Sequence, residues 1–166
     1  MNCAAKGDVE MGISAGGVEL LNAIEPLWEE LNLLHTDKSP HFSDDYRAFT
    51  FAERKKALID KSRKGRLRVS VSGKQGLIQG YAIASVEGVE GEIDSIYVRK
   101  AARGLGIGEA LMKDCLTWLR ENGAKRIRVV VVYGNEDAFG FYAKFQLFPR
   151  ATILTTPKWH ESGKTS

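Results

Sequence analysis

The chain has 166 residues, of which 43% are hydrophobic and 27% charged, values typical of one soluble globular domain. Its 24 basic and 21 acidic residues leave a net charge of +3, which is too small to indicate nucleic-acid binding by itself. No apolar run is long enough to span a membrane and no apolar signal core stands near the start, so we expect one cytoplasmic domain over 1–166, with a loose tail at 160–166.

The N-terminal part of the chain predicts one weak strand and two helices. Residues 8–15 alternate weakly, as a strand would. Residues 18–34 carry apolar side chains at helical spacing, and Pro26 inside this pattern predicts a kinked or divided helix. A polar loop over 35–46 leads to a second predicted helix at 49–64, whose basic C-terminal end we interpret mostly as a solvated face.

Three antiparallel strands are predicted in the middle of the chain. They cover residues 66–72, 77–86 and 92–98, the first of which alternates between charged and branched apolar side chains. The connections SGKQG and EGVEG are rich in turn-forming residues. These three strands should therefore form an antiparallel meander.

The remainder alternates between helix and strand. Residues 107–122 show an apolar stripe at helical spacing, and the run RIRVVVV at 126–132 suits a strand buried on both faces. A short aromatic-rich helix is expected over 138–145, with Asn135 as its N-cap, and a last strand over 150–156.

This order of elements predicts an α/β (α+β) fold. We expect a mixed, mostly antiparallel central sheet of about six to seven strands, flanked by about four helices. The strand–helix–strand unit from Ile93 to Val132 predicts one parallel pair within that sheet.

Three glycines alternate between the last strand of the meander and the next helix: Gly104, Gly106 and Gly108. Helix N-termini bind anions through unpaired N–H groups, and glycine lets the backbone come close. No Lys-Ser/Thr pair follows, which argues against a Walker A loop, and Glu109 stands where the dinucleotide pattern G-x-G-x-x-G needs glycine. An ATP- or NAD-binding protein is therefore the weaker interpretation.

The remaining pattern, Arg103-x-x-Gly106-x-Gly108, resembles the R/Q-x-x-G-x-G/A signature of the GNAT superfamily of N-acetyltransferases. The order of the predicted elements is similar to that of the family over nearly the whole chain. Asn135 and Tyr142, which follow the next strand, also match residue types that the family has there.

Two further positions bear on this resemblance. Glu92 lies eleven residues before Arg103, the offset at which a subset of the family has its general base. Gln146 departs from the family, which usually has glycine at the end of the second cofactor helix. We therefore expect that helix end to differ in shape.

The resemblance implies acetyl-CoA as the acetyl donor. The glycine loop would hold its pyrophosphate, and the preceding strand would pair with its pantetheine arm, with the N–H of Ile96 donating to the thioester carbonyl. The residues expected to bind the donor are Ile96, Tyr97, Val98, Arg103, Gly104, Leu105, Gly106, Ile107, Gly108, Asn135 and Tyr142.

Transfer to an amine needs a base and an acid. An alkyl ammonium has a pKa of about 10.4, so a base must take its proton, and Glu92 is the first candidate and Asp94 the second. Two carboxyl groups so close together could raise one pKa towards neutrality, or could bind a cationic substrate. Tyr142 is the candidate acid that protonates the departing thiolate.

These inferences predict an N-acetyltransferase that transfers the acetyl group of acetyl-CoA to a primary amine by direct attack in a ternary complex. The expected acceptor is a small amine-bearing metabolite or drug. The alternatives are a protein or peptide amine, or a non-catalytic acyl-CoA sensor on the same fold. A homodimer is compatible with the resemblance, and no nucleic acid or membrane partner is expected.

The remaining reactive residues suggest no further chemistry. Cys3 and Cys115 have no metal-ligand spacing, and no metal is expected. His35, His41 and His160 form no triad pattern, and we interpret each as a surface or loop residue. The resemblance does place the loop between His35 and His41 beside the acceptor pocket.

Overall fold

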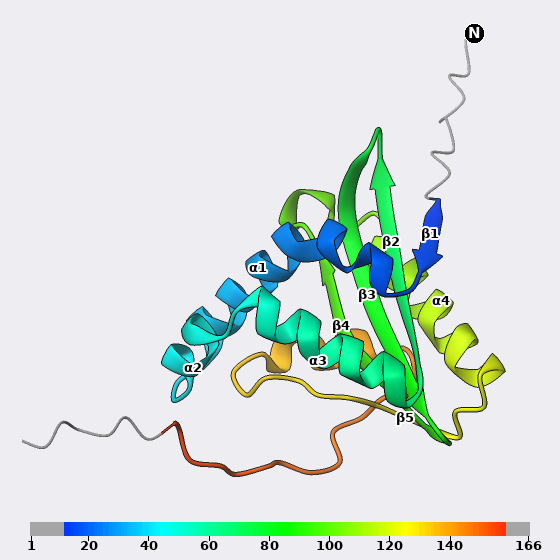
Figure 1. Cartoon of the computed structure of the whole chain (residues 1–166). Helices are drawn as coiled ribbons and strands as arrows, with labels where there is room; N and C mark the ends of the chain where they lie inside the picture. The colour runs from blue at the N-terminus through cyan, green and yellow to red at the C-terminus, as the bar shows by residue number, and fades with distance from the viewer. Residues whose placement is uncertain (1–11, 159–166) are drawn as a thin grey trace, which may run out of the picture.

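The computed structural model describes residues 12–158 (Figure 1). The first predicted strand therefore lies partly, and the predicted tail at 160–166 wholly, outside the described residues. The described chain forms one five-stranded sheet in which the strands stand in sequence order. The strands are β1 (Ile13–Gly16), β2 (Arg66–Lys74), β3 (Leu77–Glu87), β4 (Glu90–Val98) and β5 (Arg126–Val129).

The sheet has the mixed arrangement that the sequence predicts. Strands β1 to β4 pair antiparallel with their neighbours, and β5 pairs parallel with β4. The helix between β4 and β5 makes this parallel pair possible, because a parallel neighbour needs a crossover connection. The five strands in the described part are fewer than the six to seven expected.

The helices are α1 (Leu21–Lys38), α2 (Ser43–Ala48), α3 (Phe51–Lys64), α4 (Ile107–Glu121) and α5 (Phe139–Ala143). Short 3-10 turns stand at η1 (Val18–Leu20), η2 (Lys100–Ala102) and η3 (Glu136–Ala138). Of the predicted kink or division at Pro26, the division is absent, because α1 runs through Pro26 as one helix. Helix α2 occupies part of the predicted polar loop. The sequence did not predict it, because six residues are too few to show an apolar stripe.

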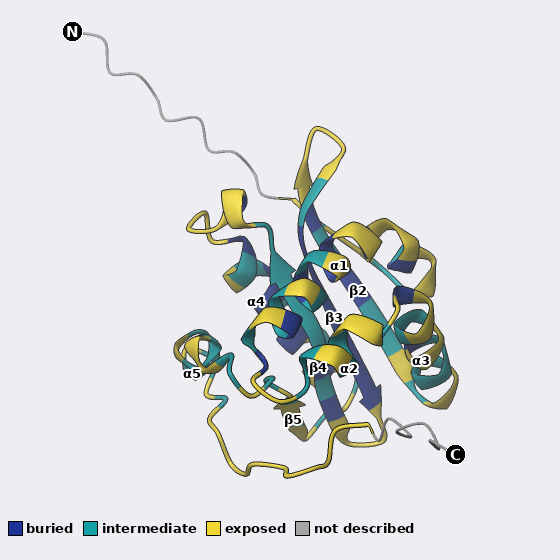
Figure 2. Ribbon diagram, turned by 90° about the vertical axis from the view of Figure 1, so that its left-hand side faces the viewer, coloured by how far each residue is buried: buried dark blue, intermediate teal, exposed yellow. Residues whose placement is uncertain are grey.

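The helices cover both faces of the sheet, which gives two apolar cores. Helices α1 and α3 pack on one face, against Val69, Tyr81 and Ile83. Helix α4 packs on the other face, against Ala82 and Ala84. Strand β3 is therefore buried on both faces, as the dark colour of its central part shows (Figure 2).

Strands β4 and β5 stay together only over their first residues. Their parallel ladder runs from Glu90 with Arg126 to Ile93 with Val129, and ends there. Strand β4 continues to Val98 along β3, whereas the chain after Val129 leaves the sheet. The sequence predicted that the whole valine run would be buried, but Val130 is 69% exposed.

The segment after α5 also differs from the prediction. Residues 150–156 were expected to form a strand, but they pair with no strand of the described chain, and their side chains are exposed. By contrast, the segment after α5 keeps the left-handed backbone conformation for which the family usually has glycine. Gln146 adopts it with a φ of 62°.

Candidate active site

A bulge in β4 lies where β5 separates from it. Ile83 of β3 pairs with Ser95 and the next residue, Ala84, pairs with Ile93, so Asp94 is an extra residue on β4. Bulges of this kind bend a strand and redirect its side chains. Beyond the bulge, one edge of β4 pairs with no strand of the described chain, so the backbone groups on that edge are free to pair with a ligand.

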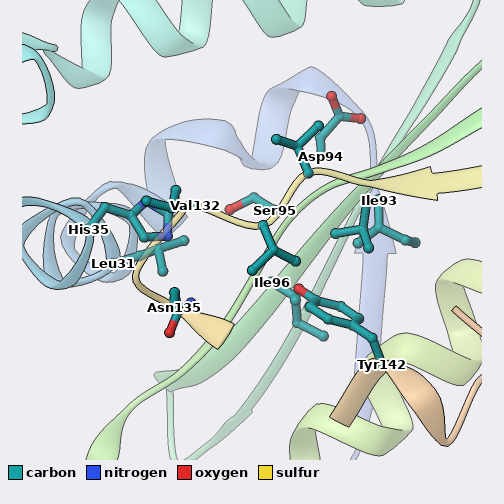
Figure 3. Close-up of a pocket in the computed structure, with 12 residues that line it drawn as sticks. Leu31, His35, Ile93, Asp94, Ser95, Ile96, Val132, Asn135 and Tyr142 are labelled. Atoms are coloured by element: carbon teal, nitrogen blue, oxygen red, sulfur yellow. The ribbon is translucent and has the colours of Figure 1, made fainter. Parts of the chain in front are cut away.

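A cavity of about 70 Å³ fills the space between the separating strands (Figure 3). We call it the β4–β5 cavity. Helix α1 forms one wall, β4 a second and the residues after β5 a third, while α5 contributes a tyrosine. The lining residues are Leu31, His35, Ile93, Asp94, Ser95, Ile96, Val129, Val130, Val131, Val132, Asn135 and Tyr142.

Tyr142 points into this cavity from α5, with its hydroxyl group towards the β4 segment that contains Ile96 (Figure 3). Its ring packs edge-on against Phe141, with 5.4 Å between the ring centroids. Burial raises the pKa of the Tyr142 hydroxyl to about 12, because the phenolate would lose its hydration. Tyr142 therefore holds its proton at neutral pH and can donate it.

Asn135 lines the opposite side of the cavity. It occupies the N-cap position of η3, as the sequence predicts for the start of this helical segment, but its side chain makes no capping hydrogen bond. Its backbone N–H donates to the carbonyl of Val132 at 2.9 Å, which fixes the turn. The side-chain amide is thus not consumed by capping.

Glu92 and Asp94 lie together but do not stand as free carboxylates. Lys61 of α3 forms ion pairs with both, at 3.1 Å from Glu92 Oε2 and in direct contact with Asp94 Oδ1. The Asp94 side chain has no exposed surface and also accepts a hydrogen bond from Ser85. Of the two carboxylates, only Asp94 lines the β4–β5 cavity.

One of the two carboxylate pKa values was expected to rise, and that of Glu92 does not. Burial pushes it upward, but hydrogen bonds from Arg128 and Lys61 and their charges outweigh burial, so the pKa is lowered. The Arg128 Nη2 lies 2.8 Å from Glu92 Oε2. The expected like-charge effect of Asp94 fails because Lys61 stands between the two carboxylates.

The glycine loop, residues 103–108, follows directly from the open edge of β4. Gly104 and Gly106 have φ angles of 81° and 82°, a left-handed conformation that side chains with a Cβ rarely adopt. Gly106 is the N-cap of α4, and the first intrahelical bond runs from the Ala110 N–H to its carbonyl. The N–H groups of the first turn are thus available to an anion.

The basic residues around the loop are held in place. Arg103 donates from Nε to the carbonyl of Val98 at 3.0 Å, and its guanidinium lies 5.5 Å from the centre of the Tyr97 ring. Arg99 Nε lies 3.2 Å from Glu30 Oε1 but in no hydrogen-bond geometry, and it is buried without a partner. In the loop itself Leu105 is exposed and Ile107 is buried.

Two residues at this site were missed by the sequence analysis. His35, interpreted there as a surface or loop residue, lies in the last turn of α1 and lines the β4–β5 cavity. Its spacing from Leu31 could have predicted this position, because residues four positions apart share the same helix face. Arg54 of α3 donates from Nη2 to the carbonyl of Asp94 at 2.7 Å, and it follows the buried Phe51 by three positions.

The basic residues at the end of α3 and the start of β2 are mostly exposed, as expected, with two exceptions. Lys61 pairs with the two carboxylates of β4, and Arg68 makes two hydrogen bonds to Asp114. Arg63, Lys64 and Arg66 are exposed and fit the solvated interpretation. Over residues 12–158 no group of histidines, cysteines and carboxylates could hold a metal ion, and no helix is apolar and long enough to cross a membrane.

Comparison with known proteins identifies the fold and the family. Three solved structures share the fold. A Bacillus halodurans protein, BH1408, aligns with a TM-score of 0.71 at 16% identity, over 89% of this chain and 99% of its own. The aminoglycoside N-acetyltransferase AAC(6')-Iy in complex with CoA gives 0.65 at 14%, over 89% and 94%. A ribosomal-protein-alanine N-acetyltransferase from Brucella melitensis gives 0.59 at 18%, over 90% and 99%.

A family model described as the acetyltransferase (GNAT) family matches residues 24–146. Because this match covers most of the chain, the chain belongs to the GNAT family of acetyltransferases. No curated protein matches its sequence significantly. The family uses acetyl-CoA, and the glycine loop, the open edge of β4 and the adjoining cavity are the features of this chain that fit such a donor.

Proposed function

We propose that this protein transfers the acetyl group of acetyl-CoA to the primary amine of a small molecule, by direct attack in a ternary complex. The observation that supports this most is the position of Tyr142. Its hydroxyl points at the open edge of β4, which the short turn η2 connects to the glycine loop. One continuous segment can thus bind the donor along its length and present its reactive end to an acid.

The donor would bind along β4 and the glycine loop. Free N–H groups at the start of α4 take the pyrophosphate, and the glycines let it approach closely. The edge of β4 over Ile96, Tyr97 and Val98 pairs with the pantetheine arm. The N–H of Ile96 donates to the thioester carbonyl and stabilises the oxyanion that develops there.

Proton transfers complete the reaction. The amine nitrogen forms a bond to the acetyl carbon as the carbon–sulfur bond breaks, and Tyr142 gives its proton to the departing thiolate. The proton of the amine leaves through water to the carboxylates beside Lys61. Glu92 is the more accessible of these, because 18% of its side chain is exposed whereas the side chain of Asp94 has no exposed surface.

Release of free CoA thiol from acetyl-CoA with a panel of amines tests this function, with Tyr142→Phe beside the wild-type protein. Loss of a general acid lowers turnover by about 10²–10⁴-fold. We expect kcat to fall within this range while the KM for acetyl-CoA changes little. Tyr133→Phe is the control, because Tyr133 is 64% exposed and lies outside the cavity.

The other outcomes are equally clear. Unchanged turnover in Tyr142→Phe would remove the tyrosine from the acid role. Acetyl-CoA binding without thiol release with any amine would favour an acyl-CoA sensor. Release only with peptides would favour a protein or peptide acceptor.

A further inference from the structure

The acceptor side of the β4–β5 cavity offers no open carboxylate to a cation. Asp94 is the acidic residue in its lining, and this side chain is fully enclosed and bound by Lys61 and Ser85. Glu92, which stands behind it, is bound by Lys61 and Arg128. An acceptor with several positive charges therefore gains little from this wall.

Arg54 does not itself line the cavity, but it binds the backbone of Asp94, which does, and it has no carboxylate partner in the described chain. Within residues 12–158, Lys38, Lys61 and Arg128 all form ion pairs with carboxylates, whereas Arg54 forms none. Its one hydrogen bond runs from Nη2 to the carbonyl of Asp94. A guanidinium has five N–H donors, so most of those of Arg54 are unused.

The unused donors of Arg54 are accessible. In the described part of the chain, Arg99 Nε is the one buried side-chain nitrogen or oxygen without a partner. The other Arg54 nitrogens bond to nothing in residues 12–158 and are not among the buried atoms, so they reach solvent. A guanidinium presented in this way matches the two oxygens of a carboxylate.

His35 adds a neutral hydrogen-bond acceptor in the cavity that Asp94 lines. Burial and then the positive charge of Arg54 lower the pKa of His35 to about 4, so the imidazole is uncharged at neutral pH. It faces Tyr46 of α2, with 5.6 Å between the rings, and shares the cavity with Asp94 and Tyr142. One ring nitrogen of a neutral imidazole accepts a hydrogen bond, as an amine N–H requires.

We infer that the acceptor carries a carboxylate next to its primary amine, as a free amino acid does, with Arg54 binding the carboxylate and His35 accepting an N–H of the amine. This inference rests on the proposed function and names its substrate class. The reaction is unchanged: the amide bond forms, the carbon–sulfur bond breaks, one amine proton goes to water or carboxylate, and the thiolate takes the proton of Tyr142.

Matched substrate pairs test the inference. Free amino acids and the amines that lack only the carboxylate, such as phenylalanine and phenethylamine or leucine and 3-methylbutylamine, are compared for CoA release. We expect kcat/KM to be at least about tenfold higher for the best amino acid than for its partner, since hydrogen bonds to charged groups are strong. Spermidine and an aminoglycoside complete the panel.

Arg54→Gln separates recognition from structure. It should lower kcat/KM for the amino acid by about 30-fold and leave that for the matched amine within about threefold, because only the former loses an ionic partner. Arg54→Lys should restore part of the loss. Arg63→Gln, an exposed arginine on the same helix, is the control and should change neither.

The outcomes distinguish the inference from the proposed function. Equal losses for both members of a pair would make Arg54 a support of the β4 bulge and overturn the inference. Better turnover of the decarboxylated amines or of the polycations would overturn it as well, while acetyl transfer would stand. No CoA release with any compound would overturn the proposed function itself.

Discussion

Tyr142 and His35 face the same cavity, and burial acts on both through the cost of removing a charge from water. Burial raises the pKa of Tyr142 to about 12 and lowers that of His35 to about 4, because the charged form is an anion in one case and a cation in the other. Both side chains are therefore neutral at physiological pH. Glu92 differs because two cations reach it and reverse the effect of burial.

The low pKa of His35 should make the fold sensitive to acid. An unfolded histidine has a pKa of about 6.5, so between pH 6.5 and 4 the unfolded chain binds a proton at this position that the folded chain does not. Stability is thus complete above pH 6.5 and is lost as the pH falls towards 4. Between pH 7 and 5 the loss should be about 1–2 kcal/mol.

Urea unfolding at pH 7 and pH 5 measures this loss, with His35→Gln as the matched variant. The variant should lose less stability than the wild-type protein over that interval, because glutamine does not titrate. All other ionisable groups are the same in the two proteins, so the difference belongs to His35. An identical loss in both would mean that His35 is accessible to protons.

The same residue shows what the sequence could and could not reveal. The motif placed Tyr142, Asn135 and the glycines together, and the structure brings Tyr142 and Asn135 to one cavity. His35 had no such pattern, and the predicted helix ended one residue before it, whereas α1 continues to Lys38. Its role depends on burial by α2, which sequence spacing does not report.

At the scale of elements, β4, the glycine loop and α4 form one unit. Gly104 and Gly106 have left-handed backbones in it, and Gly108 has a helical one. Gly106 has a φ of 82°, so alanine there would be strained by about 1–2 kcal/mol. Gly108 is helical, and a Cβ on it would lie 3.5 Å from Phe141, an ordinary contact. Gly106, like Gly104, therefore needs glycine for its backbone, whereas Gly108 does not.

This difference predicts two outcomes for acetyl-CoA binding. Gly106→Ala should weaken binding by about tenfold or more, because relief of the strain moves the N–H groups at the start of α4. Gly108→Ala should keep the affinity within about threefold and leave the fold intact. Isothermal titration calorimetry checks both, and weaker binding in Gly108→Ala alone would contradict the assignment of the anion site.

The elements that the sequence predicted well are those whose partners are local. The meander from β2 to β4 and helix α4 occur within a few residues of the predicted bounds, because hairpin turns and an apolar stripe are encoded nearby. The early end of β5 depends on the bulge at Asp94, which lies far away in sequence. Residues 150–156 have a strand-like sequence but find no partner strand in the described chain.

At the scale of the whole molecule, apolar side chains remain exposed in the part of the chain that follows β5. Strand β5 is the last in the sheet order and pairs on one side only. The segment after α5 exposes Ile153 by 84% and Leu154 by 91%, and Val130 after β5 is 69% exposed. Open strand edges and exposed apolar groups favour association.

We therefore expect the wild-type protein to self-associate, and the Ile153→Asp, Leu154→Asp double variant to associate less. Because both side chains are nearly fully exposed in the single chain, the substitutions should change the free energy of unfolding of the monomer by less than about 0.5 kcal/mol each. Light scattering over a range of protein concentrations measures the association, and circular dichroism checks the fold. Leu33→Asp is the control, since Leu33 is 62% exposed and belongs to α1 rather than to this segment. A wild-type protein that stays monomeric throughout, or a double variant that associates equally, would show that this segment is no interface.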